Sequence, residues 1–416
     1  MTTATDLYGL TLSTSSPAAE AYNRGVGALL RVQEGAFPAI SESVAHDPTF
    51  ALGHCGLALL GHEYSVGVHI EPHLDAAERH SRRATDRERS HVHAVSCHIA
   101  GDSRPLVAHL SAYPADALLL SVAVPTIAFA GVTQVPQEAW AIVERAEPAY
   151  GSDWWYSGLL AFIRQEQHRW DDAMRLACRS LDTEPQAGHS VHARTHVHYE
   201  TGDHQAGRDW LDGWIHGPGE TADNLAHFSW HAALHELSMG DFEAVRTRYS
   251  AELAPPTVFG CRALVDSCSL LWRWAITPGS DHVPEVEAVL ADIDADLVDT
   301  PPTPFVAMHA AVTLCAVGDS DRLDRLDAWA RTQPDPTYAE VVSPLAEALQ
   351  ALAAGDPSQS ADLLQGLLCS VWRLGGSEAQ REVVEDTLIA ALLAAGRYDE
   401  ARPVIDHRLD RRESRR

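Results

Sequence analysis

Four histidines form two pairs with helical spacing, His192/His196 and His227/His231. Residues four positions apart lie on the same face of an α-helix, so each pair presents two imidazoles together. The second pair follows the first by 35 residues, close to the ~34-residue period of a tetratricopeptide helix pair. Stacked repeats bring such pairs into one groove, with neighbouring helix axes roughly 10 Å apart. These four histidines are our candidate catalytic residues.

The residue types leave three interpretations of the four imidazoles open. They could coordinate zinc or another transition metal, with Glu200 or Glu236 as an outer carboxylate. They could instead exchange protons with a substrate, because imidazole titrates near neutral pH. In the third interpretation they are satisfied helix residues that hydrogen-bond to acids or to the backbone.

Three further side chains are candidates for binding a substrate in the same groove. Tyr199 could donate its hydroxyl, and Trp230 offers either a stacking face or a core side chain. Arg273 could bind an anionic ligand, although an ion pair with a local acid fits the sequence equally well.

A glycine-rich helix start supplies another candidate, Arg381. Backbone N–H groups after Gly375-Gly376 could hold an anion together with this arginine. Ser377 and Gln380 also fit a capping box, which is a structural role and the one that we favour.

Composition excludes several classes of function. A formal charge of -27 argues against nucleic acid and anionic membranes as partners. All 31 basic residues are arginine, so lysine Schiff bases, lysine-bound pyridoxal phosphate and a P-loop lysine are ruled out. The motifs GxSxG, HExxH, GxGxxG and paired CxxC are absent as well.

The cysteines and the ends of the chain predict a cytoplasmic protein. Seven cysteines are scattered without pairing signals, as expected in a reducing compartment, and most are predicted to be buried, for example Cys369. The first residues lack a signal-peptide pattern. The longest apolar run, 117–132, is shorter than a membrane span and predicts a helix that bends near Pro125.

Helical periodicity dominates the chain and predicts an all-α protein. Short glycine turns recur between the helices and predict left-handed helix ends followed by capping acids; they occur at Gly101, Gly202, Gly240, Gly318, Gly355 and Gly396. We expect one α-helical repeat domain over residues 1–416, a right-handed tetratricopeptide-like solenoid, with a frayed tail at about 411–416.

Several segments resemble the tetratricopeptide repeat protein 38 family, in order along nearly the whole chain. They lie at 47–54, 87–91, 191–198, 227–231 with 240–244, 265–273 and 375–381. The resemblance implies a helical repeat fold with histidines on its inner surface. It adds His54, His91 and His309 to the candidate ligand-binding residues and implies no settled reaction.

The chain departs from this resemblance at three polar positions. Tyr199 stands where relatives have glutamate, Val124-Pro125 replaces a His-Asp pair, and Ala307 replaces an aspartate. These changes indicate a specialised bacterial member with an altered ligand, for example in biosynthesis.

We therefore expect an enzyme that transforms a small polar molecule in a histidine-lined groove by acid–base or metal-assisted chemistry. The alternative is a non-catalytic scaffold that binds a peptide, a protein or a small ligand in that groove. A homodimer is a further expectation.

Overall fold

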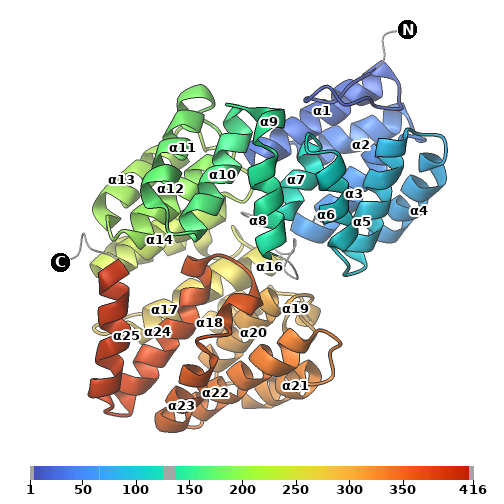
Figure 1. Ribbon diagram of the computed structural model, residues 1–416. Coiled ribbons are helices and arrows are strands. Elements are labelled where there is room, and N and C mark those ends of the chain that lie inside the picture. Colours follow the sequence, from blue (N-terminus) through green and yellow to red (C-terminus); the bar gives the residue numbers. More distant parts are fainter. Residues whose placement is uncertain (1–3, 65, 125–135, 412–416) are drawn as a thin grey trace. The chain divides into compact units, whose positions relative to one another are not determined.

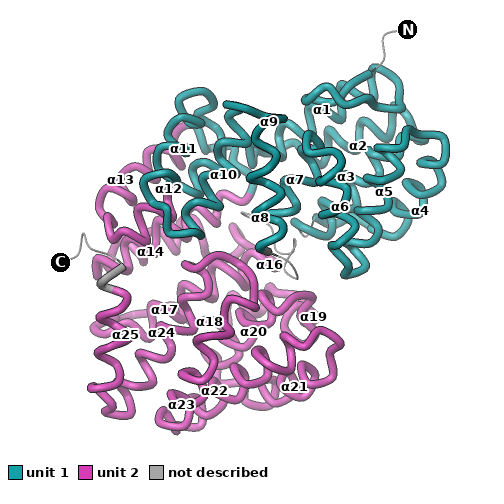
Figure 2. The backbone as a smooth tube through the Cα atoms, viewed as in Figure 1, with its two compact units in different colours: residues 1–194, 218–223 teal, residues 195–217, 224–416 magenta. Residues whose placement is uncertain are grey.

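The computed structural model describes residues 4–64, 66–124 and 136–411, and these residues form helices and no β-strand. The all-α prediction is confirmed for this part of the chain. No helix within it is long and apolar enough to cross a membrane. The chain divides into two compact units, which have different colours in Figure 2. Unit 1 contains residues 1–194 and 218–223, and unit 2 contains residues 195–217 and 224–416.

Unit 1 is built from helices that pack against their neighbours in sequence (Figure 1). Short connections between packed helices give hairpins, among them α1/α2, α3/α4, α5/α6 and α10/α11. The helices are α1 (Ser16–Arg31), α2 (Ala36–His46), α3 (Ala51–Tyr64), α4 (Ile70–Ser81), α5 (Asp86–Ile99), α6 (Arg104–Ala112), α7 (Ala117–Ala123), α8 (Pro136–Arg145), α9 (Glu147–Tyr150), α10 (Trp154–Glu166) and α11 (Trp170–Thr183).

Unit 2 repeats the pattern of packed neighbours, for example α13/α14 and α22/α23. Helix α12 (Gly188–Glu200) begins in unit 1 and continues into unit 2 after Arg194. The α-helices of unit 2 are α13 (His204–Ile215), α14 (Leu225–Met239), α15 (Phe242–Arg248), α16 (Gly260–Arg262), α17 (Ser269–Ile276), α18 (Val286–Leu290), α19 (Ala295–Asp299), α20 (Pro304–Ala316), α21 (Ser320–Ala330), α22 (Ser343–Ala353), α23 (Pro357–Leu367), α24 (Glu378–Ala394) and α25 (Tyr398–Arg411). Three π-helical segments, η1 (Tyr249–Leu253), η2 (Ala263–Cys268) and η3 (Tyr338–Val342), and one 3₁₀ turn, η4 (Val371–Leu374), lie among them.

Apolar side chains bury the inner faces of each unit. In unit 1 the ring of Tyr22 meets Phe50 edge-on at a centroid distance of 5.2 Å, and Ile40 is fully buried beside them. In unit 2 Trp214 and Phe228 lie 4.7 Å apart and join α13 to α14. Such aromatic pairs add to the stabilisation from apolar burial. This packing holds the polar side chains described below at fixed positions.

The glycine turns are confirmed as helix ends. All six glycines have left-handed φ values between 68° and 94°, a conformation that costs glycine little. Asp241, Asp319 and Asp356 cap the helices that follow three of these turns. The capping box of Ser377 and Gln380 is present at the start of α24.

The prediction for Cys369 was wrong, and the prediction for Pro125 is not tested. Cys369, predicted to be buried, is exposed, because α23 ends at Leu367 and the cysteine follows it in a turn. The predicted bend near Pro125 lies outside the described residues, since α7 is followed by 125–135.

Candidate functional site

Three of the four candidate catalytic histidines belong to unit 2, where their rings are in contact. His196 lies on α12, and His227 and His231 lie one turn apart on α14. The ring centroid of His231 is 4.7 Å from that of His196 and 4.7 Å from that of His227. All three side chains are at most 1% exposed. These contacts bring three of the four candidate histidines together.

A buried aspartate that the sequence analysis did not single out orients His227. Asp266 Oδ1 accepts a hydrogen bond from His227 Nδ1 at 3.0 Å, and Arg262 Nη1 lies 3.3 Å from the other carboxylate oxygen. Asp266 lies within η2, and π-helical turns occur often at functional sites. The hydrogen bond places the proton of the neutral ring on Nδ1, so Nε2 carries the lone pair. We call Asp266 and the histidines at 196, 227, 231 and 309 the imidazole cluster.

Burial favours the neutral form of His196 and His227. It lowers the pKa of His196 to about 3, and the fields of His227 and Arg381 add to this effect. Burial also lowers the pKa of His227, and the charge and hydrogen bond of Asp266 offset this only in part. The pKa of Asp266 stays below its usual value, because His227 and Arg262 outweigh the effect of burial. The result is an ionised carboxylate beside neutral imidazoles that can accept protons or bind a metal ion.

His309 on α20 adds a fourth imidazole near Asp266. Burial lowers its pKa to about 3, although Asp266 acts in the opposite direction. Neither ring nitrogen of His309 has a hydrogen-bond partner among the residues that the structure describes. The resemblance-based expectation that His309 shares a site with His227 and His231 fits this position.

Trp230 and Arg273 lie next to the imidazoles. The Trp230 ring stacks on His227, with centroids 5.5 Å apart and planes 11° apart. The Arg273 guanidinium lies 5.8 Å from the Trp230 ring centroid, within the range of a cation–π contact. Trp230 is thus a fully buried core side chain, the second of the two roles considered for it.

Arg273 and Tyr199 line a cavity of about 260 Å³ between α14, α17 and α24. Arg273 forms an ion pair with Asp386 at 2.8 Å, and Tyr199 donates a hydrogen bond of 2.6 Å to Glu382. Arg408 contacts both of these acids and completes the charged wall. Arg273 therefore pairs with a local acid, the second of its two predicted roles. No histidine is among the described residues that line this cavity.

Arg381 lies at the start of α24 and donates to backbone carbonyls of the preceding turn, Gly375 and Gly376. Together with the capping box, these contacts are structural, as favoured from the sequence.

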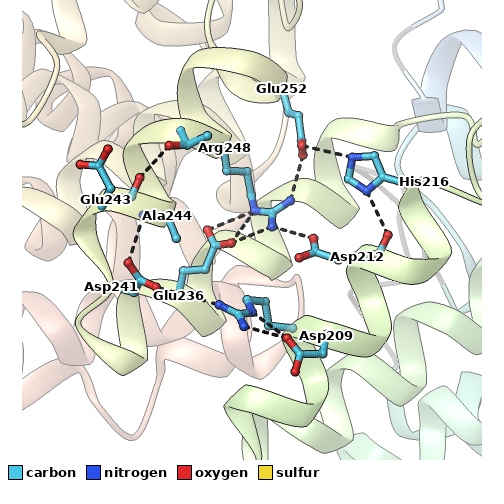
Figure 3. A network of polar contacts seen from close by, with 11 residues as sticks. Asp209, Asp212, His216, Glu236, Asp241, Glu243, Ala244, Arg248 and Glu252 are labelled. Carbon is cyan, nitrogen blue, oxygen red and sulfur yellow. Dashed lines mark hydrogen bonds and ion pairs between the residues drawn. The ribbon is translucent and has the colours of Figure 1, made fainter.

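Glu236 lies away from the imidazoles, although it was considered as an outer carboxylate. Nine residues separate it from His227, which places the two on opposite faces of α14. Its carboxylate instead pairs with Arg248 at 2.7 Å. Figure 3 shows this arginine surrounded by Glu236, Asp212 and Glu252. These residues line a separate cavity of about 460 Å³.

The remaining candidate histidines, His54, His91 and His192, belong to unit 1. His192 on α12 stacks on Phe162 of α10, with centroids 5.3 Å apart. His54 on α3 makes a hydrogen bond of 2.9 Å to His73 of α4. His54, His91 and His192 lie on the different helices α3, α5 and α12, and each contacts other residues of its own surroundings.

His91 belongs to a buried ion cluster around Asp116. Asp116 Oδ2 accepts hydrogen bonds from His91 Nδ1 at 2.8 Å, from His109 Nε2 at 3.2 Å and from Arg87 at 3.0 Å. Burial raises the pKa of Asp116, but His91, His109 and Arg87 together hold it well below its usual value. Arg87 also donates to the carbonyl of Thr11, so the cluster ties the N-terminal segment to α5.

Two groups in unit 1 have side chains close enough to share a metal ion. One is His91, His109 and Asp116, and the other is His62, Glu63 and His98. The sequence analysis named only His91 among these residues.

A sequence signal for Asp266 was available. It is a lone acid within the apolar run 263–274, and a charge buried among apolar residues needs a partner. Arg262, four positions earlier, is the expected helical partner. The histidine on α14 could not be found in this way, because that pairing depends on tertiary packing.

The sequence matches none of the known protein-family profiles.

Proposed function

We propose that the chain is an enzyme that transforms a small polar molecule by proton transfer at the imidazole cluster of unit 2. The hydrogen bond between Asp266 and His227 carries this proposal. A carboxylate that fixes Nδ1–H leaves the opposite nitrogen basic and correctly oriented, as in catalytic His–Asp pairs. His227 is then the general base, and Asp266 positions it.

The neighbouring side chains support this assignment. Arg262 keeps Asp266 ionised, so the aspartate can stabilise the imidazolium that forms when His227 takes a proton. His231 is in ring contact with the base, and His196 is in ring contact with His231, so the two rings can relay protons. Trp230 shields the base from water on its stacked face.

Metal-assisted chemistry is the second candidate, and the same hydrogen bond favours it. Histidine ligands commonly donate their other ring N–H to a carboxylate. His227 and His231, one turn apart on α14, would supply two of the ligands of a zinc ion, which would supply a Lewis acid and an activated water. Elemental analysis of the purified chain and of its His231→Gln variant separates the candidates: metal-assisted chemistry requires about one equivalent that the variant loses.

We also propose a fold, a family relationship and a cellular role for the chain. A right-handed tetratricopeptide-like superhelix related to the tetratricopeptide repeat protein 38 family fits the helix hairpins of both units. A biosynthetic role in the cytoplasm of a bacterium fits the arginine-only composition and the changed position Tyr199.

Comparative metabolite profiling tests the proposal. The full chain is incubated with pooled polar metabolites, and mass spectrometry follows which compounds disappear. We expect His227→Gln to slow the wild-type conversion by about 10²–10⁴-fold, the usual contribution of a general base. His282→Gln is the matched control, since this histidine is exposed in the same unit. Equal rates for His227→Gln and wild type contradict the proposal, and a wild type that converts nothing favours the scaffold.

A further inference from the structure

A second group of chemistry-bearing side chains lies in unit 1, apart from the proposed catalytic residues. His62 and Glu63 occupy the last turn of α3, and His98 occupies the last turn of α5. The two helices pack against each other. Both C-termini carry the negative end of a helix dipole, which favours a bound cation.

The distances within this group fit a small metal ion. His98 Nε2 lies 2.7 Å and His62 Nε2 lies 3.8 Å from Glu63 Oε1. One ligand atom from each residue lies within 4.8 Å of the others. Ligands bound tetrahedrally at 2.0–2.1 Å are about 3.4 Å apart. The separation between His98 and Glu63 has to widen, and the separation between His62 and Glu63 has to shorten. Each change is less than 1 Å, which side-chain rotation can supply.

Glu63 has an unused ligand atom inside the protein. Its side chain is fully buried, and Oε2 has no hydrogen-bond partner among the described residues. A buried carboxylate oxygen without a partner is unfavourable, and coordination to a cation removes that penalty. This oxygen is the observation that distinguishes the group from an ordinary buried ion pair.

The supporting side chains match a metal centre. Ser103 Oγ lies 2.8 Å from His98 Nδ1, so His98 can donate its Nδ1 proton to the serine and keep Nε2 for the metal. The His62 side chain is 27% exposed, which gives an ion access from solvent and leaves room for a water ligand. Among the described residues, the ion-pair partners of Glu63 are His62 and His98 and include no arginine, whereas Arg87 already neutralises Asp116 in the other group.

We propose that His62, Glu63 and His98 bind one zinc ion, with a water molecule completing the coordination. Two imidazoles and one carboxylate are a donor set that zinc accepts readily, and an open fourth position is typical of reactive zinc sites. This site is independent of the imidazole cluster, because its residues belong to unit 1 alone.

Zinc titration of the full chain tests the assignment. The chain is stripped with a chelator and titrated with Zn²⁺ against a chromophoric competitor. Loss of an outer hydrogen-bond partner commonly weakens metal binding 10–100-fold, so we expect Ser103→Ala to do so. His62→Gln and Glu63→Gln remove direct ligands, and we expect at least about 100-fold weaker binding of one equivalent.

Two control variants make the outcome specific. His46→Gln changes an exposed histidine that lies beside Glu42 in the same unit, and His227→Gln alters the imidazole cluster; both should retain the zinc equivalent. Co²⁺ bound in its place should show the visible absorption of a tetrahedral site, and His62→Gln should abolish it. Unchanged zinc binding in His62→Gln, or a wild type without such an equivalent, overturns the proposal. Since His62 is partly exposed, this variant keeps the test valid even when Glu63→Gln unfolds.

Discussion

Asp116 in unit 1 and Asp266 in unit 2 are both buried, and each binds one histidine Nδ1 and one arginine. Their surroundings differ. All three donors to Asp116 converge on a single oxygen, and its arginine also holds the backbone at Thr11. Asp266 divides its oxygens between His227 and Arg262, and its histidine lies against a second imidazole and an indole. The same residue types thus join chain segments in one unit and orient a buried imidazole in the other.

The strongest test of this comparison replaces each aspartate by asparagine. Asp266→Asn keeps the shape but removes the charge that orients His227 and stabilises its protonated form. We expect the turnover number to fall roughly 10³–10⁴-fold, measured on whichever compound the wild type consumes. Asp116→Asn should leave the turnover of the folded protein within about twofold. Equal losses in the two variants would remove the functional distinction between the units.

For the free energy of unfolding, we expect Asp116 to matter more than Asp266. Asp116→Ala leaves Arg87 buried without its carboxylate, and breaking such a buried pair costs about 3–5 kcal/mol. Urea unfolding followed by circular dichroism measures this loss. Glu42→Gln, which removes an exposed ion pair with Arg24, is the control and should leave the unfolding curve unchanged. A small effect of Asp116→Ala would show that the cluster does not hold the N-terminal segment.

As the pH falls, the imidazole cluster should lose its contribution to the free energy of unfolding before Asp116 loses its own. The folded pKa of His196 and of His309 is about 3, whereas the unfolded chain takes up these protons near pH 6.5. Their contribution to stability is therefore complete above pH 6.5 and falls as the pH drops towards 3, by about 1.4 kcal/mol per pH unit for each histidine. The contribution of Asp116 is complete above pH 3.8 and falls only below it, because its folded pKa is lowered.

Unfolding free energies at pH 7.5, 6.5, 5.5 and 4.5 check this order. His309→Gln should reduce the slope below pH 6.5 by about 1.4 kcal/mol per unit, while His282→Gln should not change it. A slope that is the same in His309→Gln and wild type would mean that His309 is not held neutral by burial.

The smallest expected effect concerns the outer partner of the Asp116 cluster. Ser90 Oγ lies 2.8 Å from His109 Nδ1, and Ser90→Ala should cost about 0.5–1.5 kcal/mol in unfolding free energy. Ser111→Ala on the exposed side of α6 is a suitable control. A change in turnover on Ser90→Ala would assign a functional role to unit 1 that the comparison does not.

Local features were predictable because they depend on few neighbouring residues. Glycine turns need a left-handed backbone, and the Ser377–Gln380 box needs only three residues of spacing. The contact between His227 and His231 was also predictable, since residues four positions apart share one face of a helix.

Features that depend on packing between distant segments were not predictable. Asp266 meets His227 across 39 residues, and Glu63 meets His98 across 35, without a local pattern that selects either pair. The π-helical segments were missed for a similar reason, because hydrophobic periodicity does not distinguish a widened turn from a regular one. Glu236 was misplaced because its proximity to His231 in sequence was considered without its rotation around α14.

The winding of one helix has a consequence for engineering. Residues 260–276 run without interruption through α16, η2 and α17. In a regular α-helix, eleven positions of separation would point Arg262 and Arg273 in nearly the same direction. The wider turns of η2 rotate them apart, so one guanidinium serves Asp266 and the other serves Asp386. Deleting a single residue from η2 would remove the widened turn and rotate Arg273 relative to Arg262, which makes helix register itself an adjustable parameter in this protein.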